Sequence, residues 1–289
     1  MARLGPPDRG AMDDDNNAMT SVLELTAAPA SRRTVLDDVA SHREVLMALA
    51  RKDFQTRYKR ATLGILWAVA VPVLQAAVMA VVFSKIVRFD TKSEYAPFVM
   101  VGIVAWTYFA GTVTAGSTAI VDNASLTEKV WFPRALLPVV PALANSIGFI
   151  VSLTVVVILL PVFGVSLEPR LLLLPAATVL LVAFTAALSL VLSALHVYFR
   201  DVRYLVQAAL LVWIYVTPII FPQSILGRWS WLLDFNPLTG IVDLFRLATM
   251  GTEDGWARPV VASVVATFAL ALVALEIYRR HDRLFVDQL

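Results

Sequence analysis

Six long runs of apolar residues, separated by short charged segments, constrain the fold of this 289-residue chain more than any other feature. A helix that crosses a bilayer needs about 20 mostly apolar residues. Hydrophobic residues make up 58% of the chain and charged residues 16%, against about 45–50% and about 25% in soluble domains. The sequence therefore predicts an all-α polytopic membrane protein with six transmembrane helices. The predicted spans are residues 61–84, 95–121, 136–163, 171–197, 204–222 and 259–277.

The distribution of Lys and Arg predicts how the spans are oriented. With the N-terminus placed in the cytosol, the cytosolic segments hold more Lys and Arg near the spans than the outer segments do. Because cytosolic loops carry this excess, we expect both termini in the cytosol and the protein in the cytoplasmic (inner) membrane. Residues 1–35 are polar and rich in Pro and Ala, and they lack the apolar core of a signal peptide. We expect them to form a disordered cytosolic tail.

Residues 36–60 are predicted to form an amphipathic helix on the cytosolic face of the membrane. Their apolar positions fall on one side at helical spacing, and basic residues gather near the end. Ser41 and Glu44 match the pattern of a capping box at a helix start. The apolar positions are Val39, Leu46, Ala50 and Phe54.

Residues 223–257, between the fifth and sixth spans, are predicted to form short re-entrant or interfacial helices on the outer side. The segment is apolar but broken by glycines such as Gly227. Asn236 followed by Pro237 is typical of a helix start, and Gly251 is typical of a helix end. The 14 residues between these signals are too few to span a bilayer. Residues 61–289 are therefore expected to form one membrane domain.

The sequence lacks the usual groups of a catalytic or ion-coupled membrane protein. It has no cysteine and no phosphate-binding GxxxxGK[ST] loop. Ionisable residues are almost absent from the spans, and His196, at one span end, is interpreted as an interfacial histidine rather than a proton relay. No paired carboxylates or metal-spaced histidines are evident. We therefore expect no catalytic or metal site, and we expect the energy for any uphill transport to come from another chain.

Two predicted cytosolic loops, residues 123–138 and 196–204, combine charges with aromatic side chains. Trp, Tyr and Arg dominate the energetics of protein interfaces, so these loops are predicted to dock a partner protein. Ordinary membrane-interface placement of aromatic and basic residues is the alternative for either loop by itself.

Several motifs, in order, resemble the permease subunits of type-2 ABC exporters. They are RYKRATLGILWAVAVPVL (57–74), EKVWFPRALLP (128–138), VYFRDVRYL (197–205), TPIIFP (217–222) and NPLTGIVDLFR (236–246). The resemblance covers about residues 41–289, and its closest branch exports O-antigen, teichoic acid or other lipid-linked polysaccharides.

The resemblance implies a homodimer of six-span permeases that binds two copies of an ABC ATPase subunit. ATP and Mg would be bound by that partner, and this chain would bind no cofactor and no nucleic acid. The resemblance also makes the two cytosolic loops the ATPase-coupling segments, and outer helices at 223–257 the gate. The coupling residues it implies are Glu128, Lys129, Trp131, Phe132, Arg134, Arg200 and Asp201.

Aromatic side chains recur at helical spacing on the second and fifth spans. Aromatic faces pack against the apolar faces of sugar rings, and aromatic rings line such channels in the resembling family, so these residues are candidates for contact with a glycan. Core or lipid-facing packing is the alternative. Gln75, Asn145 and Gln207 are interpreted as interhelical hydrogen-bonding residues in preference to channel contacts. The channel candidates are Phe98, Trp106, Tyr108, Phe109, Trp213, Thr217 and Phe221.

These features predict the transmembrane subunit of an ATP-driven exporter of a polyprenyl-diphosphate-linked cell-envelope polysaccharide, of O-antigen, teichoic acid or galactan type. Within the same fold, the alternative is a permease for a drug or small lipid. An alternative of another class is a membrane-embedded glycosyl- or acyltransferase, which needs a polar catalytic cluster that the sequence does not reveal.

Overall fold

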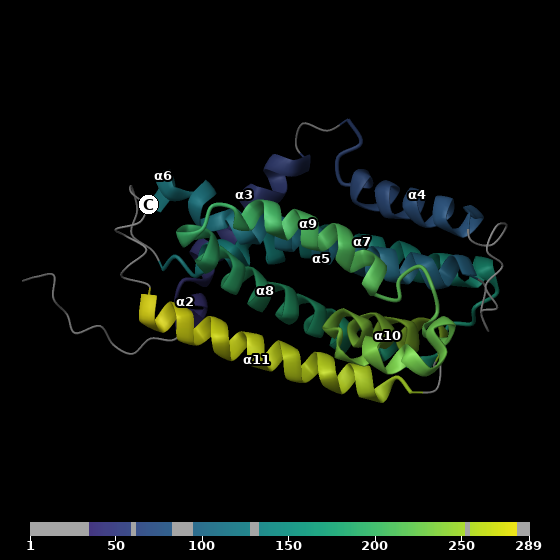
Figure 1. The fold of residues 1–289 in the computed structure, drawn as a ribbon. Helices are drawn as coiled ribbons and strands as arrows, with labels where there is room; N and C mark the ends of the chain where they lie inside the picture. Colours follow the sequence, from purple (N-terminus) through teal and green to yellow (C-terminus); the bar gives the residue numbers. More distant parts are fainter. Residues whose placement is uncertain (1–34, 59–61, 83–94, 128–132, 252–254, 282–289) are drawn as a thin grey trace, which may run out of the picture.

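The computed structural model describes residues 35–58, 62–82, 95–127, 133–251 and 255–281. Every element in these ranges is helical, as predicted, and the long helices lie side by side in one bundle (Figure 1). In chain order the elements are α2 (Val35–Ser41), α3 (Arg43–Tyr58), α4 (Leu66–Val82), α5 (Tyr95–Asp122), α6 (Ala124–Thr127), α7 (Leu136–Leu159), η3 (Leu160–Phe163), η4 (Pro169–Leu173), α8 (Leu174–Tyr198), α9 (Val202–Val216), η5 (Gln223–Phe235), α10 (Pro237–Met250) and α11 (Ala257–His281).

Four helical segments among the described residues are long and apolar enough to cross a membrane. They coincide with the predicted second, third, fourth and sixth spans. Their bounds are Tyr95–Asp122, Leu136–Phe163, Pro169–Tyr198 and Ala257–Arg280.

The predicted first and fifth spans are shorter helices than the sequence suggested. Residues 62–65 form turns before α4, with Gly64 at φ +51°, so the helix begins at Leu66 rather than at residue 61. Helix α9 ends at Val216, because Thr217 precedes Pro218 and a residue before proline is pushed into the extended region. Thr217 has φ −93° and ψ 135°. The 15 residues of α9 span about 22 Å at 1.5 Å per residue, less than the roughly 30 Å hydrocarbon core.

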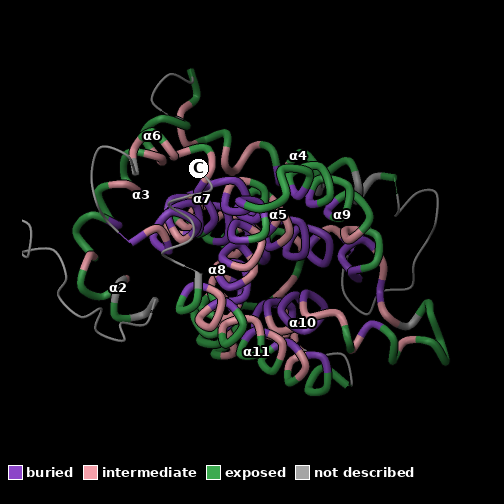
Figure 2. Tube along the Cα trace, turned by 60° about the vertical axis from the view of Figure 1, so that its left-hand side comes forward, coloured by how far each residue is buried: buried purple, intermediate pink, exposed green. Residues whose placement is uncertain are grey.

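Helix α5 is the centre of the bundle. In its membrane-spanning window 67% of the residues are buried, against 17% in α11. Figure 2 shows the buried residues on α5, α7 and α8 in the interior and exposed residues on the outer faces of α4 and α11. Small residues allow the helices to approach closely, as is usual between membrane helices. A Cβ on Gly116 of α5 would lie 2.5 Å from Ser189 Oγ of α8.

The predicted interface helix is two helices, α2 and α3, rather than one. Ser41 is the last residue of α2 and its hydroxyl hydrogen-bonds to His42, while α3 begins at Arg43. The capping-box pattern at Ser41 thus places the start of α3 one residue earlier than the structure does. The predicted apolar stripe exists: Leu46 and Ala50 are buried, and they pack in a core cluster with the first turns of α7.

The predicted outer helices are η5 and α10. Gly227 interrupts η5 with φ 50° and ψ −120°. Asn236 caps α10 as predicted, since its Oδ1 accepts from the Leu238 amide, and Pro237 is the first helical residue. Gly251 ends α10 at φ +87°. Helix α10 lies within the bundle, packed against α5, α8 and α11, and its end of the bundle is called the α10 end below (Figure 1).

Candidate functional site

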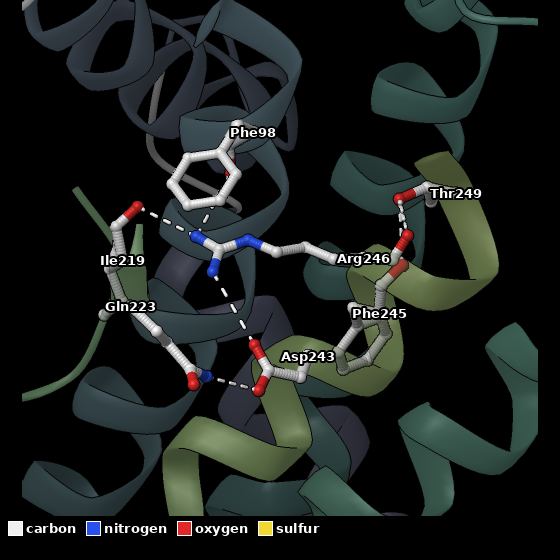
Figure 3. A network of polar contacts seen from close by, with 7 residues as sticks. All are labelled: Phe98, Ile219, Gln223, Asp243, Phe245, Arg246 and Thr249. Atoms are coloured by element: carbon white, nitrogen blue, oxygen red, sulfur yellow. Dashed lines mark hydrogen bonds and ion pairs between the residues drawn. The ribbon is translucent and has the colours of Figure 1, made fainter. Parts of the chain in front are cut away.

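A buried cation, Arg246 of α10, holds the TPIIFP segment (residues 217–222) that follows α9. Arg246 is 7% exposed and extends from α10 toward α5 (Figure 3). Its Nη2 donates to the Ile219 carbonyl at 3.1 Å, and its guanidinium carbon lies 3.5 Å from the centre of the Phe98 ring. A guanidinium is weakly hydrated and stacks well on an aromatic face. Arg246 therefore ties the segment after α9 to the first turns of α5.

Asp243 and Tyr95 complete this polar network. Asp243 Oδ1 lies 3.8 Å from Arg246 Nη1, and its Oδ2 accepts from Gln223 Nε2 at 2.6 Å. The Tyr95 hydroxyl donates to the Ile220 carbonyl. Backbone carbonyls of a non-helical segment need such partners wherever water is excluded. The network thus provides hydrogen-bond donors for the Ile219 and Ile220 carbonyls and fixes the TPIIFP segment between α5 and α10.

Two of the predicted aromatic residues, Trp106 and Trp213, pack around a third, Phe109, in the core of the chain. The Phe109 ring is fully buried, with ring centres 5.5 Å from Trp106 and 5.3 Å from Trp213. Phe98, Tyr108 and Thr217 are also buried, while Trp106, Trp213 and Phe221 are half-buried. In the single chain the stripe therefore packs against α8 and α9. Its contact with a glycan stays a prediction.

Polar residues of α5 and α7 join these two helices, as interpreted from the sequence for Asn145. Asn145 Nδ2 donates to Thr112 Oγ1 at 2.9 Å, and the Tyr108 hydroxyl donates to the Ala142 carbonyl at 2.9 Å. Gln75 and Gln207 are exposed in the single chain. Beside this junction a cavity of about 190 Å³ opens between α4, α5 and α7. Its polar lining comes from Arg57, Thr107, Tyr108, Asn145 and Ser152.

The opposite end of the bundle, called the α6 end, carries the three predicted coupling residues that the structure describes, Arg134, Arg200 and Asp201. Arg200 and Asp201 are exposed in the turn between α8 and α9. Next to them, Arg203 at the start of α9 donates to Asp122 at the end of α5 at 2.7 Å. Arg134 is half-buried, and its Nη1 has no hydrogen-bond partner among the described residues.

The other predicted coupling residues lie outside the described residues. These are Glu128, Lys129, Trp131 and Phe132. The turn at 196–204 and the ends of the 123–138 loop do lie at the same end of the bundle (Figure 1).

The sequence analysis missed the buried pair Asp243 and Arg246, because it assigned residues 223–257 to short outer helices without predicting a buried charge in them. A local signal was present. Once Asn236 fixes the start of α10, Arg246 falls near the apolar face formed by Leu238, Ile241, Val242 and Phe245. Charge on a buried helix face marks a paired or functional residue.

Within the described ranges no three His, Cys, Asp or Glu side chains gather so as to hold a metal ion. The polar networks described above join helix to helix and use backbone carbonyls as their main acceptors.

The described elements are all helical and four of these helical segments are long enough to cross a bilayer, so the chain is an integral membrane protein. A family model described as ABC-2 type transporter matches residues 44–250. The chain therefore belongs to the ABC-2 type transporter family, which confirms the predicted resemblance. In this family the permease is a transmembrane subunit and the ATPase is a separate subunit, so a partner ATPase is implied.

Three curated relatives place the chain with the O-antigen export permeases of this family. An O-antigen export system permease protein of Klebsiella pneumoniae is 29% identical over 218 residues, covering 73% of this chain and 83% of the relative. One from Myxococcus xanthus is 26% identical over 255 residues, covering 87% and 98%. A second from Klebsiella pneumoniae is 26% identical over 248 residues, covering 84% and 94%.

Proposed function

We propose that the chain is the transmembrane subunit of an ATP-driven exporter that moves a polyprenyl-diphosphate-linked cell-envelope polysaccharide across the cytoplasmic membrane. The observation that carries this proposal is the similarity, over most of both chains, to permeases named for O-antigen export. ATP and Mg are bound by the partner subunit. This chain provides the path and the docking surface.

The proposed topology has six spans with both termini in the cytosol. Four of these spans are the longer helical segments. Helices α4 and α9, each extended by neighbouring non-helical residues, are the first and the fifth. The α6 end then faces the cytosol and the α10 end faces outward, in line with the excess of Lys and Arg near the α6 end.

The proposed assembly is a homodimer with two ATPase subunits. The outer face of α9 is apolar and exposed in the single chain, with Leu205 at 67%, Leu211 at 68% and Tyr215 at 66%. This face is free to contact either lipid or a second copy, and a second copy beside α9 would enclose a path between the two chains.

The α6 end is proposed to dock the ATPase through residues 123–138 and 196–204. Arg200 and Asp201 are exposed there, so reversing a charge removes a contact without disturbing the core. Truncating one member of a desolvated charge pair at an interface costs about 2–5 kcal/mol. We expect Arg200→Glu to reduce co-purification of the ATPase. Arg228→Glu, an exposed charge at the α10 end, is the matched control and should copurify normally.

Depletion of the chain in its native host tests the substrate class. We expect polyprenyl-diphosphate-linked glycan to accumulate inside the cell and the corresponding surface polysaccharide to disappear. Surface polysaccharide that stays unchanged would contradict a glycan substrate, and increased sensitivity to a drug would instead favour the drug-exporter alternative.

A further inference from the structure

Asn236 joins the end of α9 to the start of α10 through a single side-chain amide. Its Oδ1 accepts from the Leu238 amide at 3.1 Å and from Trp213 Nε1 at 3.0 Å. Its Nδ2 donates to Thr217 Oγ1 at 2.9 Å. Trp213 and Thr217 are in the last turn and at the C-cap of α9. One side chain thus caps α10 and also holds the end of α9.

The rest of α9 is attached to the bundle by a narrow contact. Val202, Val206 and Leu210, four residues apart, are the buried residues of α9. At the α6 end Val202 is buried in the core cluster, and the polar link there is the ion pair of Arg203 with Asp122, whose side chains are 45% and 48% exposed. Exposed ion pairs contribute little to stability. Polar contacts of α9 are therefore few and exposed at the α6 end, whereas several join it to α10 at the other end.

The joint with α10 has a second connection along the TPIIFP segment. Arg246 of α10 holds the Ile219 carbonyl, and Asp243 of α10 holds the Gln223 side chain. Together with Asn236, these contacts attach α10 to the segment before, within and after residues 217–222. The non-helical segment is therefore bonded to α10 at both of its ends and within it.

We propose that Asn236 is a positioning residue that makes α9, the TPIIFP segment and α10 move as one unit when a partner displaces the α6 end of α9. This inference rests on the proposed function, because ATP binding by the partner supplies the displacement. The linkage needs more polar contacts between α9 and its neighbours at the α10 end than at the α6 end, which is the arrangement observed.

Two variants separate this linkage from ordinary helix capping. Asn236→Ser keeps a good N-cap residue, but its side chain is too short to reach Trp213 and Thr217. Thr217→Val removes the hydroxyl that receives the Asn236 amide and leaves the cap intact. Thr249→Val is the matched control: Thr249 is a buried threonine of α10 whose hydroxyl bonds the Phe245 carbonyl of its own helix.

The experiment measures glycan exported per ATP hydrolysed by the reconstituted permease–ATPase complex. Losing a buried hydrogen bond changes an equilibrium about fivefold. We therefore expect the ratio to fall about fivefold in Thr217→Val, which loses one bond to Asn236, and further in Asn236→Ser, which loses two, while ATP hydrolysis continues. We expect Thr249→Val to keep the original ratio. A purely structural role would lower the yield of complex and leave this ratio unchanged.

A second readout follows the two helices separately. The chain has no native cysteine, so an environment-sensitive fluorophore is attached at Ala208→Cys in α9 or at Leu247→Cys in α10. We expect ATP to change both signals in the otherwise unaltered complex, and Asn236→Ser to retain the change at residue 208 and lose it at residue 247.

Two results would overturn the inference. One is an unchanged export ratio and an unchanged residue-247 signal in both linkage variants; the other is an equal loss in Thr249→Val. If the unaltered complex itself exports nothing on ATP addition, the proposed function fails first, and the inference falls with it.

Discussion

The buried pair of Asp243 and Arg246 gives the sharpest test of how the α10 end is held together. We expect Arg246→Met to destabilise the protein far more than Asp243→Asn does. We also expect the double variant to be less destabilised than the sum of the two single variants. The physical reason is that removing Arg246 leaves the carboxylate of Asp243, only 13% exposed, without its cation.

The magnitude follows from the contacts of each side chain. Removing one partner of a buried ion pair costs about 3–5 kcal/mol, and Arg246 also loses its bond to Ile219 and its contact with Phe98. Asp243→Asn keeps an acceptor oxygen for Gln223 and loses an ion pair that is long, at 3.8 Å. Its cost is about 1 kcal/mol. The double variant has neither the cation nor the carboxylate, so no buried charge is left without its partner. We therefore expect its loss of stability to be smaller than the sum of the two single losses by a coupling energy of about 1–3 kcal/mol.

The free energy of unfolding is measured for the four proteins of this cycle in mixed detergent and dodecyl sulfate micelles. Arg228→Met is the control. Arg228 is exposed, and like Arg246 it lies over an aromatic ring: its guanidinium carbon is 5.3 Å from the centre of the Trp229 ring. We expect the control to change stability by less than about 0.5 kcal/mol. Strictly additive single and double variants, or a control as damaging as Arg246→Met, would refute the reasoning.

Three further predictions concern packing, the transport path and topology. Gly240→Ala should destabilise the protein by about 1–3 kcal/mol, because its Cβ would lie 2.0 Å from a backbone oxygen of α11; Gly111→Ala, with no atom within 4 Å, should be neutral in the same unfolding assay. Trp106→Ala should lower export while leaving assembly and basal ATP hydrolysis intact if the half-buried ring contacts the glycan; a loss of expression instead would assign Trp106 to the core. Ser166→Cys should react with an impermeant thiol reagent added outside the cell and Ser125→Cys should not, both sites being exposed; the reverse pattern would invert the topology.

The sequence predicted a helix start or end correctly where the residues that cause it lie within a few positions of it. The start of α10 was predicted correctly because Asn236 and Pro237 act on the amides directly after them. The end of α9 was predicted at residue 222, six residues late. Pro218 already signals a helix end at Thr217, but the apolar run continues beyond it to Pro222. Apolar composition indicates the length of a run and not the residue at which its helix stops.

The polar joint was not predicted because its contacts are distant in sequence. Arg246 meets Phe98 and Ile219, which lie 148 and 27 residues away along the chain. The spacing of the aromatic residues did not predict the environment of Phe109 either. Lipid-facing, core and path-lining residues of a membrane helix are all apolar, so spacing alone does not distinguish them. The fully buried ring of Phe109 became evident only from its packing with α8 and α9.

Reconstitution tests the central claim most directly. The chain and its partner ATPase are placed in vesicles that carry polyprenyl-diphosphate-linked glycan in the leaflet that the ATPase faces, and the glycan that reaches the other leaflet is measured with a lectin that cannot enter the vesicle. We predict transfer that requires ATP, the ATPase and this chain together, with no ATP hydrolysis by the chain in the absence of its partner. Glycan transfer that proceeds without ATP, or ATP hydrolysis by the isolated chain, would contradict the account.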